Sequence, residues 1–116
     1  MEFYTKVVGV TFNNEGENTE NRQRIIAELS RKGYLNEGTE LTLRRDPTNQ
    51  YDTNAVAVLA PDGRQIGYLS RDVASKVSPD IDTGAHYAAF VEAVTGGDAD
   101  SVYGVNIKCV RESIIE

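Results

Sequence analysis

An amide, an aromatic ring and an acid lie close together in the middle of the sequence, at Asn49, Tyr51 and Asp52. A tyrosine ring offers a face on which an unstacked base can stack, and a neighbouring carboxylate accepts hydrogen bonds. The pair Tyr51-Asp52 has no obvious packing role at the end of a loop, where binding residues are common. Asn49 either contacts the same ligand or braces the loop, since asparagine side chains satisfy turn amides.

Two further aromatic residues and one basic residue extend this candidate site. Tyr68 stands near the end of an expected strand, and Phe12 lies much earlier in the chain. For each ring two roles stay open, one as part of the hydrophobic core and the other as a stacking face for a base. Arg71 opens an expected helix, whose first backbone amides also favour a phosphate. These residue types together predict a site that holds a single nucleic-acid strand.

The sequence contains little that could support catalysis or bind a metal. His86 is the only histidine and Cys109 the only cysteine, and one of each cannot make a structural zinc site. There is no glycine-rich phosphate loop of the Walker type, and the serines do not stand in the context of a nucleophile elbow. We therefore predict a protein that is not an enzyme and that uses no metal and no cofactor.

The distribution of charge favours a local contact with nucleic acid over a broad one. The 116 residues carry a net charge of −6, which argues against a strong general binder of phosphates. Residues 41–76 hold five basic and four acidic residues, whereas residues 77–116 hold two basic and seven acidic ones. The candidate site falls mostly in the one third of the chain that is not acidic.

Hydrophobic alternation and turn formers predict about six short strands. The expected strands span residues 6–12, 40–45, 54–60, 65–69, 87–94 and 102–110. The third and fourth should form a hairpin across the turn Pro61-Asp62-Gly63, and the last two should pair across Gly96-Gly97-Asp98. Gly67, inside a strand, marks either a bulge or a close approach of a ligand.

Two short helices are expected between the strands. The first begins after Asn18 or Thr19 as its N-cap and ends at Gly33. The second begins after Ser70, runs from Arg71 to about Val77, and is closed by Ser78-Pro79.

This arrangement predicts one domain, 1–116, of mainly β structure. Six short strands without a β-α-β rhythm favour a small OB-like antiparallel β-barrel with two short helices. No apolar run approaches the ~20 residues that span a bilayer, and the first residues show no signal peptide. The single cysteine cannot form an internal disulfide and is compatible with a reducing compartment, so we expect a cytoplasmic protein.

The central residues resemble the HIRAN domain family. A strand ending in Arg45 is followed by Asp46-Pro47-Thr48-Asn49-Gln50-Tyr51-Asp52-Thr53-Asn54-Ala55, then by Ile66-Gly67-Tyr68-Leu69 and a helix containing Ala74. Gly9-Val10 and Asn21-Arg22-Gln23 extend the resemblance over nearly the whole chain. It implies an OB-like barrel with two helices and, by analogy with members attached to helicase-like ATPases, binding to single-stranded DNA at a free 3′ end.

The resemblance also implies a role for individual positions. Tyr51 matches the tyrosine that stacks on a base, and Asp52 matches the acid that accepts a hydrogen bond from the terminal 3′-hydroxyl. Arg71 stands where the family has a basic residue for a phosphate. The helicase-attached members carry a basic residue where this chain has Thr11, and proline is usual where it has Gln50.

Two functions follow from the sequence. The first is a non-catalytic module that binds single-stranded DNA ends in DNA repair or processing, using Phe12, Asn49, Tyr51, Asp52, Tyr68 and Arg71. The second is a protein–protein interaction domain on the same barrel, favoured by the acidic charge and by Thr11. The choice between DNA and RNA, the partners and the oligomeric state stay open.

Overall fold

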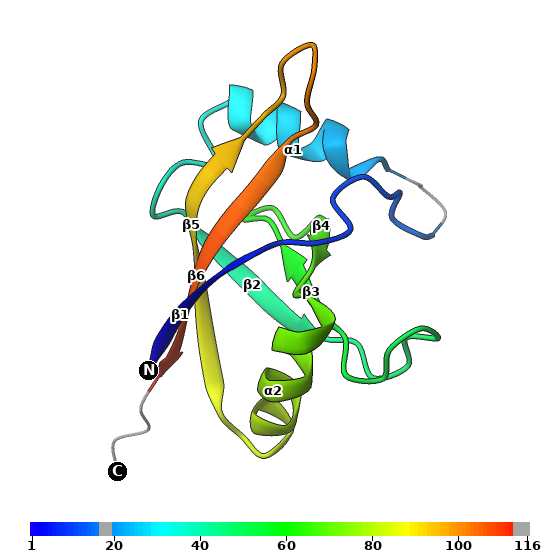
Figure 1. Ribbon diagram of the computed structural model, residues 1–116, viewed down its shortest axis with the longest axis vertical. Coiled ribbons are helices and arrows are strands. Elements are labelled where there is room, and N and C mark those ends of the chain that lie inside the picture. Colours follow the sequence, from blue (N-terminus) through cyan, green and yellow to red (C-terminus); the bar gives the residue numbers. More distant parts are fainter. Residues whose placement is uncertain (17–19, 113–116) are drawn as a thin grey trace.

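The computed structural model describes residues 1–16 and 20–112 and has a mainly β fold, as the sequence predicts. Six antiparallel strands form one strongly curled sheet, and a helix lies at either end of it (Figure 1). The elements in chain order are β1 (Glu2–Lys6), α1 (Arg22–Arg31), β2 (Glu40–Arg45), β3 (Val56–Leu59), β4 (Gln65–Tyr68), α2 (Arg71–Asp82), β5 (His86–Thr95) and β6 (Gly104–Glu112).

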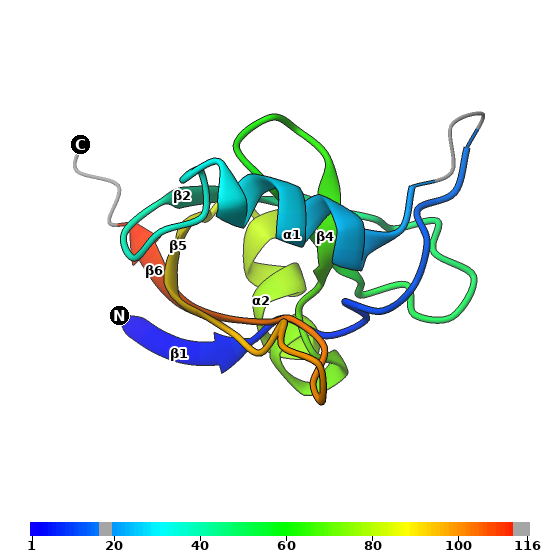
Figure 2. The same cartoon turned by 90° about the horizontal axis from the view of Figure 1, so that it is seen from above.

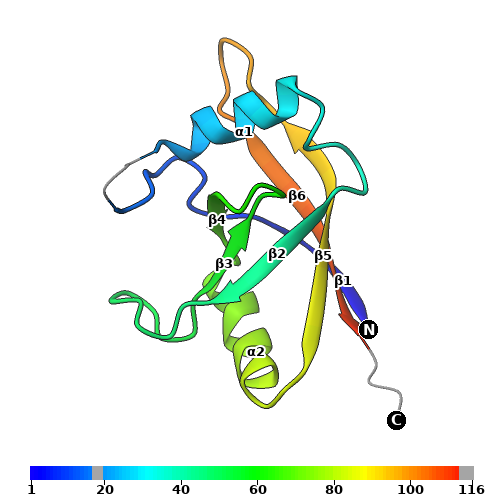
Figure 3. The same ribbon diagram turned by 180° about the vertical axis from the view of Figure 1, so that it is seen from behind.

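The sheet curls until its two ends meet next to the candidate site. The strand order is β1-β6-β5-β2-β3-β4, so β1 and β4 lie at opposite ends (Figure 3). Just after β1, Val8 and Tyr68 exchange both backbone hydrogen bonds, at 2.8 and 2.9 Å. This single antiparallel bridge, which we call the seam, joins the two ends and makes the curled sheet barrel-like.

Gly67 is required for the seam because the two chain segments approach very closely there. A Cβ at this position would collide with the carbonyl oxygen of Val8 and with Cγ1 of Val7. The register of β3 and β4 also shifts opposite Gly67, between Val58 and Leu59. The expected bulge is therefore present, and it coincides with a close approach of the chain's own backbone.

The core fills the inside of the curled sheet and is covered at one end by α1. The side chains of β3, β4 and β6 supply fully buried Val56, Val58, Ile66 and Ile107. Helix α1 crosses above the sheet (Figure 2) and buries Ile25, Ile26 and Leu29. Apolar burial of this kind provides most of the folding free energy. No helix in the described part of the chain is long and apolar enough to cross a membrane.

The start of α1 differs from the sequence prediction. Its N-cap is Asn21, whose side chain accepts a hydrogen bond from the amide of Arg24. The expected caps Asn18 and Thr19 lie outside the described residues. The predicted end of the helix is confirmed, since Lys32 is the C-cap and Gly33 follows with a φ of +80°.

Two other expectations were wrong. Residues 6–12 do not form a strand, because Gly9 has a φ of +71° and the amide of Phe12 turns back to the carbonyl of Gly9. Lys6 is the last residue of β1 and pairs with Asn106, and of residues 7–12 only Val8 forms a β-bridge, so the first strand lies earlier in the chain than expected. Helix α2 continues through Pro79, although a proline disfavours a helix interior, because the amide of Thr83 still bonds to the Pro79 carbonyl and Asp80 is held by Tyr87 and Arg111.

Candidate functional site

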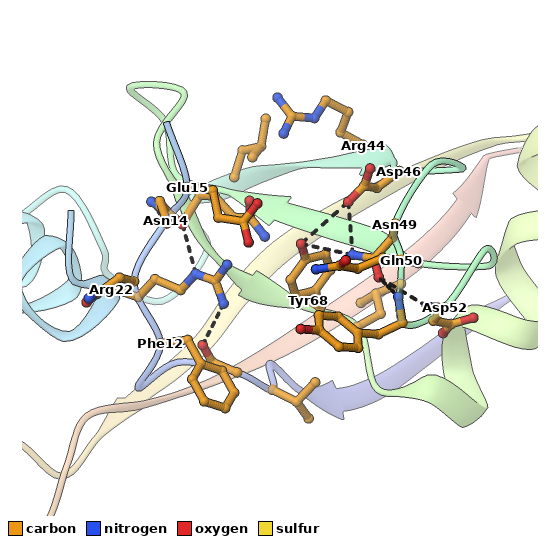
Figure 4. A pocket seen from close by; sticks show the side chains of 18 of the residues that line it. Phe12, Asn14, Glu15, Arg22, Arg44, Asp46, Asn49, Gln50, Asp52 and Tyr68 are labelled. Carbon is orange, nitrogen blue, oxygen red and sulfur yellow. Dashed lines mark hydrogen bonds between the residues drawn. The ribbon is translucent and has the colours of Figure 1, made fainter. Parts of the chain in front are cut away.

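An open depression of about 1260 Å³ lies beside the seam, between the loop that precedes α1 and the loop that joins β2 to β3. Backbone segments far apart in the sequence meet here because the seam joins Val8, just after β1, to Tyr68 at the end of β4. Figure 4 shows side chains that line the depression. All six residues predicted from the sequence line this depression: Phe12, Asn49, Tyr51, Asp52, Tyr68 and Arg71.

Asn49 organises the loop between β2 and β3. Its Oδ1 accepts hydrogen bonds from the backbone amides of Tyr51, at 2.9 Å, and Asp52, at 3.1 Å. The loop is closed at its base by the bond from the amide of Asp46 to the carbonyl of Ala55. Asn49 therefore braces the loop, which is one of the two roles that the sequence left open.

Tyr51 and Phe12 present aromatic rings to solvent at the depression. Tyr51 is 77% exposed and Phe12 is 66% exposed, so neither ring belongs to the core. The Arg71 guanidinium donates a 2.9 Å hydrogen bond to the Tyr51 carbonyl and thereby ties the loop to the start of α2. Exposed rings on a braced backbone provide ready platforms for stacking.

Asp52 has one carboxylate oxygen engaged locally. Its Oδ1 accepts a 2.9 Å hydrogen bond from the amide of Asn54, which stabilises the turn into β3. Among the described residues, no hydrogen bond to its Oδ2 is present, so this oxygen can accept one from a ligand. Asp52 is half-buried beside the exposed Tyr51 ring.

Tyr68, Asp46 and Asn49 form a loose cluster on the floor of the depression. The Tyr68 hydroxyl lies 3.4 Å from Asp46 Oδ2 and 3.3 Å from Asn49 Nδ2, and Asn49 Nδ2 lies 3.1 Å from the same Asp46 oxygen. Hydroxyl hydrogen bonds are usually shorter, about 2.7 Å. Tyr68 is half-buried, so it belongs partly to the barrel and partly to the site.

Of the two adjacent arginines on β2, only Arg44 lines the depression. Arg45 points to the other side of the strand, as alternation requires. There it pairs with Asp82, at 2.9 Å, and donates to the carbonyl of Ala55. This ion pair raises the pKa of Arg45.

Three carboxylates and three guanidinium groups face the depression, so its local charge is balanced although the chain is acidic. They belong to Glu15, Asp46, Asp52, Arg22, Arg44 and Arg71. The described residues contain no group of three side chains that could hold a metal ion. The site is therefore suited to a ligand that combines negative groups, aromatic faces and hydrogen-bond donors.

Comparison with known proteins identifies the family. The family model of the HIRAN domain matches residues 1–112. The chain belongs to the HIRAN domain family. The crystal structure of the HIRAN domain of human HLTF has the same fold, with a TM-score of 0.67 and 21% identity over 95% of this chain and 74% of that one. A protein structure from Lactobacillus plantarum matches with a TM-score of 0.64 and 20% identity, covering 97% of this chain and 100% of the other.

The curated relatives are much longer than this HIRAN domain. The helicase-like transcription factor of Mus musculus is 36% identical over 57 residues, which are 49% of this chain and 6% of that protein. An Arabidopsis thaliana protein, a putative SWI/SNF-related matrix-associated actin-dependent regulator of chromatin subfamily A member 3-like 1, is 39% identical over 51 residues. These residues are 44% of the chain and 6% of the relative.

Arg22 is a further residue of the depression in this HIRAN domain, and its sequence context did not predict it as a site residue. Arg22 is only 5% exposed, and its guanidinium carbon lies 5.2 Å from the centre of the Tyr68 ring. Burial lowers its pKa, and Tyr68 and Glu15 partly offset that effect. The resemblance included Asn21-Arg22-Gln23, but nothing in local spacing indicates that the first residue of a helix reaches across to β4.

Proposed function

We propose that this HIRAN domain is a non-catalytic module that binds single-stranded DNA ends carrying a free 3′-hydroxyl, in DNA repair or processing. The observation that carries the proposal is the meeting of two exposed rings, Phe12 and Tyr51, with the carboxylate of Asp52 in one depression. The fold and the family agree with it, because the curated relatives include helicase-like transcription factors.

In this proposal the two exposed rings stack on bases of the strand. Stacking on aromatic side chains contributes about 1–3 kcal/mol per base and tolerates any sequence. Tyr51 is held by the loop that Asn49 braces, so little conformational entropy is lost when a base settles on the ring. Tyr68, deeper in the depression, contributes the edge of its ring and its hydroxyl.

Asp52 and Arg71 account for the recognition of the end. A carboxylate near phosphates is repelled unless a hydroxyl donor meets it, so Asp52 Oδ2 selects a terminal 3′-hydroxyl over a 3′-phosphate. Arg71 retains guanidinium donors beyond the one that bonds to Tyr51. It holds a phosphate together with the first amides of α2.

Fluorescence anisotropy with short oligonucleotides at low salt tests this function. The set compares a free 3′-hydroxyl, a 3′-phosphate and a blunt duplex. Asp52→Asn keeps an oxygen for the Asn54 amide but replaces Oδ2, and we expect it to lose the preference for the 3′-hydroxyl, about tenfold. Asp100→Asn, on the exposed turn between β5 and β6, changes the charge equally and should keep the preference.

Tyr51→Ala should weaken binding by about 30-fold, in the middle of the range for one lost stacking contact. Tyr34→Ala is the matched control, because Tyr34 is also an exposed tyrosine but lies outside the depression. Equal affinity of Tyr51→Ala and Tyr34→Ala would contradict the stacking role. Failure of the wild-type chain to bind any oligonucleotide at ~10⁻⁴ M would reject the DNA function.

A protein–protein interaction domain is the second candidate, and the edge of β1 favours it. Strand β1 is an edge strand of the sheet, and within the described residues it pairs only with β6 along its length. Tyr4 projects from it with 61% exposure. A peptide could add a strand to this edge. Chemical-shift changes confined to residues 2–6 when a peptide partner is added would favour this function over the first.

A further inference from the structure

Arg22 is the most deeply buried charged side chain that faces the depression, and its guanidinium lies over the ring of Tyr68. We propose that Arg22 binds a phosphate group of the bound strand from the floor of the depression, and that Glu15 competes with that phosphate. This inference rests on the proposed function and adds a phosphate-binding residue to it.

The guanidinium of Arg22 is held rigidly but keeps donors for a ligand. Its Nε donates to Asn14 Oδ1 and its Nη1 to the carbonyl of Gly9, both at 2.8 Å (Figure 4). Electrostatic attraction and hydrogen bonding to the Tyr68 hydroxyl raise the pKa of Arg22, but a neutral hydroxyl provides no counter-charge. In the described part of the chain the only buried side-chain N or O atom without a partner is Ser78 Oγ. Among the described residues no hydrogen bond from Nη2 is present, so in this proposal the Nη2 donors face the phosphate in the open space of the depression.

Three other arginines of the fold have carboxylate partners, whereas Arg22 has none among the residues that the structure describes. Arg45 pairs with Asp82, Arg111 with Asp80, and Arg64 with three carboxylates. Within the described ranges, Arg22 makes no ion pair. A buried cation without a counter-charge is costly, and an anion that pairs with it recovers much of that cost. The preformed guanidinium is also planar and suited to two parallel bonds with a phosphate.

Glu15 is the carboxylate placed to act on Arg22 before a strand binds. It is exposed, lines the same depression and interacts electrostatically with Arg22 without forming an ion pair. Its side chain stands beside the guanidinium in Figure 4. An incoming phosphate must therefore overcome repulsion from Glu15 when it approaches Arg22.

Charge-matched variants test the inference by anisotropy with a single-stranded oligonucleotide. Glu15→Gln should tighten binding about threefold at low salt, as expected for removing one screened repulsion. Glu37→Gln is the control, because it changes the net charge equally at an exposed position away from the depression. Arg22→Lys should weaken binding about tenfold and abolish the gain from Glu15→Gln. It should also reduce the slope of log affinity against log salt by about 0.7, the value for one phosphate contact.

A second measurement separates this inference from the proposed function and does not depend on how well Arg22→Lys folds. The Nε–Hε signal of Arg22 in the ¹⁵N-labelled wild-type chain is followed while inorganic phosphate is added, against chloride at equal ionic strength. A shift with phosphate alone supports the anion site, even if no oligonucleotide binds and the DNA function is rejected. An unmoved signal, or equal affinities of Glu15→Gln and Glu37→Gln, would overturn the role of Arg22.

Discussion

A tyrosine hydroxyl hydrogen-bonds to an aspartate at two places in this HIRAN domain, and the two clusters differ in how short their hydrogen bonds are. At the end of the molecule near α2, the Tyr87 hydroxyl donates to Asp80 Oδ2 at 2.6 Å, and Arg111 Nε donates to the same oxygen at 2.7 Å. In the depression, the Tyr68 hydroxyl lies 3.4 Å from Asp46 Oδ2, and an amide takes the place of the arginine.

We call Tyr87, Asp80 and Arg111 the closed cluster. Its short hydrogen bonds shift the pKa values of Asp80 and Tyr87. The hydrogen bonds from Tyr87 and Arg111 lower the pKa of Asp80. Burial is the main cause that raises the pKa of Tyr87, and the hydrogen bond to Asp80 raises it further. These groups already have partners of opposite charge or polarity, so they stabilise the fold and have little capacity left for a ligand. The long bonds around Tyr68 leave that capacity available. Residue types alone therefore do not separate a structural cluster from a candidate binding site, whereas the lengths of the hydrogen bonds do.

The largest expected effect comes from the seam that carries Tyr68. Gly67→Ala should lower the free energy of unfolding by about 3 kcal/mol, because the new methyl group collides with the Val8 carbonyl and with Val7. It should also weaken oligonucleotide binding, since the seam positions both walls of the depression. Urea denaturation and anisotropy measure the two effects.

Gly84→Ala is the control beside the closed cluster. Gly84 has a φ of +105°, and a methyl group added there would meet no other atom within 4 Å. Only backbone strain of about 1 kcal/mol is therefore expected, and binding should be unchanged. Equal losses of stability in the two variants would show that the close approach at the seam is unimportant.

A pair of hydroxyl deletions sharpens the comparison directly. Tyr87→Phe should cost about 1.5 kcal/mol of stability, because it removes a short hydrogen bond to a charged acceptor. Tyr68→Phe should cost less than about 0.5 kcal/mol, because its bonds are long. The order should reverse for binding, so that Tyr68→Phe weakens the affinity for oligonucleotides more than Tyr87→Phe does. The comparison fails if Tyr68→Phe proves as destabilising as Tyr87→Phe.

The smallest expected effect is a pH dependence that arises from the closed cluster. Because the pKa of folded Asp80 lies below its ordinary value of 3.8, its contribution to stability is present above that pH. The contribution is lost as the pH falls through the folded pKa. Asp80→Asn should therefore be less stable than the wild type at pH 6, and the difference should shrink between about pH 5 and pH 2 in urea titrations. A difference that stays constant over this range would contradict the assignment.

Much of the candidate site could be predicted from the sequence because its signals are local. The loop from Asp46 to Asn54 combines turn formers with an exposed tyrosine and an acid, and these residue types act through neighbours within a few positions. Arg22 could not be found in this way. Its partners Gly9, Asn14 and Tyr68 are brought together only when the chain folds back on itself.

The errors in the elements have the same origin. Residues 6–12 have β-branched side chains and were expected to be a strand, but the turn at Gly9 leads the chain away after one bridge to β4. Pro79 was expected to end α2, yet the next turn is held by Asp80, which bonds to Tyr87 and Arg111 on the neighbouring strands. In both cases long-range contacts override a local preference.

Local sequence was enough to specify the mainly β class, the two helices, the hairpin turns and six of the residues that line the depression. Periodicity and turn chemistry encode these features over short distances. Three outcomes required the folded chain. The sheet curls until Val8 meets Tyr68, and Arg22 lies buried with no carboxylate partner among the described residues. One tyrosine–aspartate pair has short hydrogen bonds, whereas the other has long ones. Those outcomes depend on which distant segments come into contact, and that depends on packing of the whole chain.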